Sequence, residues 1–148
     1  MSIKQKGYTL VELVVVILLI GVMGSMMQIG NKMIEHIALE TSVQQVTKGI
    51  EYAKQAAAVS GQQYNVFFHE NRVLVRKGIE KPIYTIRLPK NQRIYVRMGE
   101  QMVMFDGDIT TKDAQTIKII NDNLNRQARL TVDIATSKIR VYYEKYKL

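Results

Sequence analysis

Glu12 is the residue whose position in the sequence most needs a chemical explanation. It lies near the start of an apolar stretch that runs from Tyr8 to Ile29, and it carries the only charge in that stretch. A carboxylate inside a membrane-spanning segment costs roughly 2.5–3.5 kcal/mol on insertion scales. We therefore expect Glu12 to have a specific role, unless it lies close enough to the membrane interface to stay hydrated.

Other candidates for catalytic or metal chemistry are isolated. His36 and His69 have no cysteine or cluster of acidic residues beside them in the sequence, which is typical of surface histidines. Asp106-Gly107-Asp108 could suggest a calcium loop, but such a loop needs several more ligands, so a turn is favoured. Neither a P-loop nor a serine nucleophile motif is present. We therefore predict no enzymatic activity, no metal and no cofactor.

Arginines that alternate with apolar and aromatic residues are concentrated in the second half of the chain. The candidates for nucleic-acid binding are Arg72, Arg76, Arg87, Arg93, Arg97 and Arg140. A positive surface with rings for stacking suits single-stranded nucleic acid, whereas duplex binding depends mainly on charge. Exposed arginines also occur routinely on outward strand faces, where they protect sheet edges from aggregation. The sequence leaves both explanations open.

The length of 148 residues fits one membrane helix and one small globular domain. Because no cysteine is present, the domain has no disulfides and must depend on core packing. The formal net charge of +8 favours anionic partners such as nucleic acid, wall polymers or lipid headgroups. A solvated surface of ordinary lysines and arginines explains this charge equally well.

The apolar stretch is long enough to cross a bilayer. At about 1.5 Å per residue, residues 8–29 form a helix of about 33 Å, against about 30 Å for a bilayer core. A cleaved secretory signal has a shorter apolar core and ends in small residues. A plain anchor explains the length and the flanking Lys4 and Lys6, which the positive-inside rule leaves in the cytoplasm. It does not explain an acidic residue five positions after Gly7.

These residues resemble the class III signal of type IV pilins and type II secretion pseudopilins. The matching run is Lys6-Gly7-Tyr8-Thr9-Leu10-Val11-Glu12-Leu13. The resemblance implies that a prepilin peptidase cuts between Gly7 and Tyr8, that Tyr8 is N-methylated, and that Glu12 serves assembly. Tyr8 stands where phenylalanine is usual, and Ile29 stands where major pilins often have proline. The second difference favours a minor subunit.

Physical chemistry supports this role for Glu12. Cleavage frees the α-amine of Tyr8, a cation that has no partner on its own chain. Glu12 of one subunit can pair with the Tyr8 amine of the next, so that each charge offsets the burial of the other. Desolvation consumes much of the Coulomb attraction, so the pair is better viewed as a register device than as a source of stability.

An α+β fold is predicted for the rest of the chain. Apolar residues spaced three or four apart predict an amphipathic helix: Leu39, Val43, Val46, Ile50, Ala53 and Ala57. Gly61 is expected to end it. The period then changes to two, which predicts seven or eight short antiparallel strands. The expected segments are a leader 1–7, a transmembrane or filament-core helix 8–30, an amphipathic helix 31–60 and a small antiparallel β-sheet domain 61–148.

The strand domain resembles the GspH/FimT and ComGD groups of minor pseudopilins. The similarity rests on residues 53–60 with the hairpin that follows at once, and on Phe105 and Gly107 with the final strand 138–141. The closing turn of those groups usually carries Thr-Gly, whereas this chain has Thr136-Ser137.

Together these resemblances imply a minor pseudopilin, a structural subunit of a type IV pilus-like, competence or type II secretion filament that assists DNA uptake or protein secretion. The implied partners are other pilin subunits, the prepilin peptidase and methyltransferase, and, indirectly, an assembly ATPase and an inner-membrane platform protein, with DNA as a further candidate. The implied location is the cell membrane, crossed once with the N-terminus in the cytoplasm, and then a surface filament. The alternatives are a pilus-tip subunit that binds DNA or another ligand through its basic strand face, and a single-pass membrane protein that is never processed.

Overall fold

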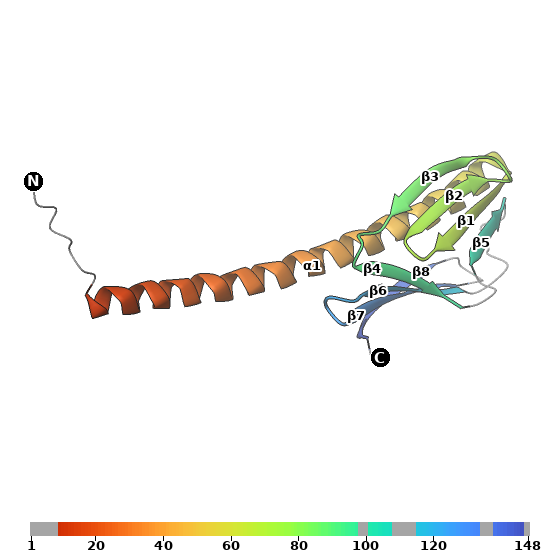
Figure 1. The fold of residues 1–148 in the computed structure, drawn as a ribbon. Coiled ribbons are helices and arrows are strands. Elements are labelled where there is room, and N and C mark those ends of the chain that lie inside the picture. The colour runs from red at the N-terminus through yellow and green to blue at the C-terminus, as the bar shows by residue number, and fades with distance from the viewer. Residues whose placement is uncertain (1–8, 98–100, 108–114, 134–137, 147–148) are drawn as a thin grey trace, which may run out of the picture. The chain divides into compact units, whose positions relative to one another are not determined.

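A computed structural model describes residues 9–97, 101–107, 115–133 and 138–146. In these ranges the elements are α1 (Leu10–Ser60), β1 (Gln63–His69), β2 (Arg72–Lys77), β3 (Pro82–Arg87), β4 (Gln92–Val96), β5 (Met102–Asp106), β6 (Gln115–Asn121), β7 (Arg126–Val132) and β8 (Ile139–Lys145), as Figure 1 shows. The chain forms two compact units that divide between Ile34 and Glu35, and α1 runs through both.

The second half of α1 packs as its sequence pattern predicts. The six apolar residues at helical spacing are all at most 3% exposed, and they belong to the core of the second unit. The helix ends at Ser60, as expected. Gly61 follows with a φ of +62°, in the left-handed region that glycine adopts without strain, and its N–H donates to the Ala57 carbonyl at 2.9 Å.

The strands form two four-stranded antiparallel sheets rather than one small sheet. Sheet A has the order β3-β2-β1-β5, and sheet B has the order β4-β6-β7-β8 (Figure 1). The predicted α+β class is confirmed, but the division into two sheets was not predicted. Alternating hydrophobicity shows which face of a strand is buried and does not show which strand lies beside it.

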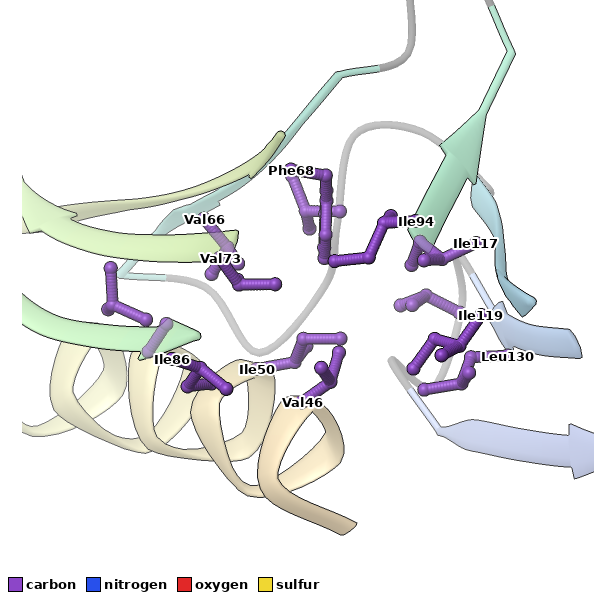
Figure 2. Close-up of a cluster of buried hydrophobic side chains, with 14 of the residues drawn as sticks. Val46, Ile50, Val66, Phe68, Val73, Ile86, Ile94, Ile117, Ile119 and Leu130 are labelled. Atoms are coloured by element: carbon purple, nitrogen blue, oxygen red, sulfur yellow. The ribbon is translucent and has the colours of Figure 1, made fainter. Parts of the chain in front are cut away.

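The inner faces of both sheets and the second half of α1 pack together in one hydrophobic core. Figure 2 shows Val46 and Ile50 of α1 near Val66, Val73 and Ile86 of sheet A. On the other side of the cluster lie side chains from sheet B: Ile94, Ile117, Ile119 and Leu130. Burying each large aliphatic side chain contributes about 1.5–3 kcal/mol. Because successive side chains of a strand point to opposite faces, the residues between these positions lie on the outer faces.

Candidate functional site

Glu12 lies in the first turn of α1, whereas Gly7 and Tyr8 lie outside the described residues. The backbone N–H of Glu12 donates to Oγ1 of Thr9 at 3.3 Å and to the carbonyl of Thr9 at 3.0 Å. Thr9 therefore caps the helix, and Thr9-x-x-Glu12 has the spacing of a capping box. A negative charge in the first turn also suits the positive end of the helix dipole. This local role for Glu12 was missed, although the spacing alone could have indicated it.

An uncovered apolar surface follows Glu12 along the first unit. The exposed fractions of its large apolar side chains between Leu10 and Ile34 range from 46% at Val22 to 80% at Leu10. By length and composition α1 can cross a membrane. Its most apolar segment of 18 residues is not buried in the structure. A surface of this kind needs lipid or other helices around it.

The candidate arginines are divided between the two sheets. Arg72, Arg76 and Arg87 lie on sheet A, Arg93 and Arg140 lie on sheet B, and Arg97 is exposed just beyond β4. Some of them already have partners within the domain. The Arg76 guanidinium lies 5.2 Å from the centroid of the Phe67 ring, and Nη2 of Arg93 lies 3.2 Å from Oδ1 of Asp122. The six arginines therefore do not form one binding surface.

The outer face of sheet B holds a row of residues that sequence analysis did not bring together. The register places Tyr95 of β4 beside Lys118 of β6, Lys118 beside Arg129 of β7, and Arg129 beside Tyr142 of β8. The side chains of Tyr95 and Tyr142 are 58% and 43% exposed. Lys118 and Arg129 lie between buried residues of their strands, a pattern that many strand residues share, and only the strand order brings the four side chains into one row.

Glu35, the first residue of the second unit, is held by three asparagine side chains from sheet B and the turns beside it. Nδ2 of Asn121 donates to Oε2 of Glu35 at 3.0 Å, and Nδ2 of Asn123 donates to Oε1 at 2.9 Å. Asn91 also donates to Oε2. These bonds fix α1 to one end of sheet B. Sequence analysis missed this anchor, because Asn91, Asn121 and Asn123 are far from Glu35 along the chain.

The asparagine contacts lower the pKa of Glu35. The largest cause is the hydrogen bond from Asn121, followed by that from Asn123; partial burial opposes them, and Asn91 adds to the lowering. Hydrogen bonds to a carboxylate favour its charged form. The anchor is therefore strongest when Glu35 is ionised.

Replacing Glu35 by alanine is expected to destabilise the second unit by about 1–2 kcal/mol, because the buried Asn121 amide loses its acceptor while solvent screens the rest. Since the folded-state pKa is lowered, the contribution is fully present above the ordinary value of 4.5 and is lost as the pH falls through the folded-state value. Thermal unfolding of both proteins at several pH values measures this difference. Glu51→Ala, at an exposed position of the same helix, is the control. If the stability difference between the unaltered protein and Glu35→Ala does not become smaller at acidic pH, the charge of Glu35 has no role in the anchor.

The described residues contain no group of three or more His, Cys, Asp or Glu side chains that could hold a metal ion. Gly107 has a φ of +65°, as a turn residue does, while Asp108 lies outside the described residues.

Comparison with known proteins connects the first unit to a known motif. Residues 3–27 match the family model of the prokaryotic N-terminal methylation motif. The fold matches crystal structures of the type IV minor pilin FimU from Pseudomonas aeruginosa strain PAO1. One crystal form gives a TM-score of 0.60 at 11% identity, covering 76% of this chain and 93% of that one. The chain therefore carries an N-terminal methylation motif and has a fold similar to that of a type IV minor pilin.

A second crystal form of FimU gives a TM-score of 0.58, also at 11% identity, and covers 74% of this chain and 95% of that one. At such low identity the likeness shows the fold alone. No curated protein matches this chain significantly in sequence.

Proposed function

We propose that this chain is a minor pilin-type subunit of a membrane-based filament. A prepilin peptidase cuts it after Gly7, Tyr8 is N-methylated, and the mature subunit joins the filament through its apolar helix. The observation that carries the proposal is an uncovered apolar helix that bears the N-terminal methylation motif and belongs to a chain with a pilin-like fold.

The exposed first unit supplies a surface for neighbouring subunits. Once the subunit leaves the bilayer, exposed apolar side chains in water are unfavourable, and packing against the helices of other subunits removes that penalty. Glu12 is exposed at the start of this helix, where it can reach the Tyr8 amine of another subunit. The charge pair then fixes the register between two otherwise featureless apolar surfaces.

The cell membrane is the proposed site of insertion, with Lys4 and Lys6 in the cytoplasm and the second unit outside. The peptidase and methyltransferase act on the inserted precursor. An assembly ATPase and an inner-membrane platform protein then extract the mature subunit. DNA uptake or protein secretion is the proposed setting.

Replacing Gly7 by alanine is expected to abolish maturation in cells that supply a prepilin peptidase. Mass spectrometry of the unaltered protein should show a chain that begins with N-methyl-tyrosine at Tyr8, and the Gly7→Ala protein should retain its leader. Gly30→Ala is the matched control, because a Cβ at Gly30 meets no atom within 4 Å, and it should mature normally. An intact leader on the unaltered protein would instead favour a single-pass membrane protein that is never processed.

A further inference from the structure

We propose that the outer face of sheet B binds single-stranded nucleic acid. The centre of this face is the row Tyr95, Lys118, Arg129 and Tyr142, which crosses all four strands. Directly paired residues of antiparallel strands lie on the same face of a sheet. The core confirms which face this is, because the neighbouring residues Ile94, Ile119 and Leu130 point inward (Figure 2). The row therefore faces away from the core.

The two tyrosines supply flat surfaces at opposite ends of the row. Three inter-strand spacings separate them, or about 14 Å at roughly 4.8 Å each. Base stacking on an aromatic ring accepts every base, because every base has a π-face. The Arg129 guanidinium lies 5.2 Å from the centroid of the Tyr142 ring and already contacts it, so at this end of the row a base would stack on the guanidinium, and at the other end on the ring of Tyr95. Guanidinium planes also stack on unpaired bases.

The positive charge of the face is only partly neutralised. Nη2 of Arg129 lies 2.7 Å from Oε1 of Glu144, and Arg93 pairs with Asp122 at 3.2 Å. Lys118 in the central row and Arg140 in the adjacent row form no ion pair with the described residues of the domain. Lys118 lies between the two tyrosines and Arg140 lies next to Tyr142 along β8, where phosphates of a strand stacked on the rings would pass.

The row of this face that lies on the side away from Arg140 is closely packed. Ile120 and Gln127, which pair with each other, are 4% and 9% exposed, and Nε2 of Gln127 donates to Oε2 of Glu144 at 3.2 Å. The outward side chains therefore rise from rigid strands, which lowers the entropy that binding costs.

The outer face of sheet A lacks this combination. Phe67 is half-buried with Arg76 lying over its ring, and Leu74 is only 6% exposed. Arg72 and Arg87 lie side by side on β2 and β3, and the residue paired with Arg72 on β1 is His69, whose imidazole offers a smaller ring than the two tyrosines of sheet B. Sheet B thus combines two exposed tyrosine rings with cations that have no ion-pair partner among the described residues, and single-stranded nucleic acid can use both. A polyanion without bases would make no contact with the rings.

Fluorescence anisotropy of a labelled oligo(dT) of about 12 nucleotides, with the full chain in neutral detergent, tests the stacking surface. Tyr95→Ala is expected to weaken binding by about 5- to 100-fold, which is the loss of one stacked base, while Tyr95→Phe keeps the ring and the affinity. Tyr84→Ala is the matched control, because Tyr84 is 46% exposed on sheet A. Unchanged affinity in Tyr95→Ala, or an equal loss in Tyr84→Ala, would overturn the proposal.

The salt dependence of the same titration tests the cations. The combined Lys118→Gln and Arg140→Gln variant should reduce the slope of log affinity against log salt by about 0.7 for each phosphate that the protein no longer neutralises. Arg72→Gln on sheet A should leave the slope unchanged. Unlabelled inorganic polyphosphate and a DNA duplex of the same length are the competitors. If either competes as well as unlabelled oligo(dT), the surface recognises charge alone, and the proposal is overturned. The face can bind nucleic acid whether or not the chain is processed, so failure here leaves the proposed subunit role intact.

Discussion

Glu12→Gln is expected to leave the chain processed and membrane-inserted but to lower its incorporation into filaments roughly 100-fold or more. Glutamine has nearly the shape of glutamate, so the change removes the charge and little else. The Tyr8 amine of the neighbouring subunit then lies in the apolar interior without a counter-ion. Removing one partner of a buried ion pair costs about 3–5 kcal/mol. The ratio of subunit in sheared filaments to subunit in membranes, measured by immunoblot, reports the effect.

The helix cap at Thr9 can be separated from the charge pair of Glu12 by the choice of variant. Glutamine is also compatible with a capping box, so Glu12→Gln should preserve the helix start that Thr9 forms. Thr9→Ala removes the cap and keeps the charge. Its cost is about 0.5–2 kcal/mol of local helix stability, and incorporation should fall far less. Equal incorporation of Glu12→Gln and the unaltered protein would reject the charge pair.

Phe105→Ala is expected to destabilise the second unit by about 3–5 kcal/mol. Phe105 is 0% exposed, is among the largest fully buried side chains of the described residues, and lies on β5 beside Tyr64 of β1. Its removal loses the transfer free energy of the ring and leaves a cavity that rigid strands fill only in part. The melting temperature of the full chain in neutral detergent should fall by about 10–20 °C.

Phe67→Ala is the matched control for this substitution. Phe67 lies on the outer face of β1, is half-buried and contacts the Arg76 guanidinium. Its loss should cost about 1–2 kcal/mol, from partial burial and one cation–π contact. Equal melting temperatures for the two variants would mean that Phe105 is not part of the rigid core.

Much of the fold follows from local patterns. Leu39, Val46 and Ala57 recur at helical spacing, and they are buried because one stripe of a helix must face a core. Gly61 ends the helix because a left-handed φ is favourable for glycine. The described residues contain eight strands, where seven or eight were expected, since alternation and turn residues are local signals.

The candidate sites were less predictable. Arg72 and Arg93 looked equivalent in the sequence, yet they lie on different sheets. Lys118 and Arg129 gave no distinct signal, because a cation between apolar residues is common on any strand. Glu35 had no visible partner, since Asn121 and Asn123 are far from it along the chain and approach it only when sheet B packs on α1.

The sequence alone determined the features that depend only on residues close together in the chain. The signal around Gly7, the apolar helix, its amphipathic continuation and the strands all depend on neighbouring residues, so their physics is local. The tertiary structure decided what depends on pairing between distant segments: the division into two sheets, the Glu35 anchor and the row from Tyr95 to Tyr142. Strand order and register are fixed by how the whole core packs, and no short stretch contains that information.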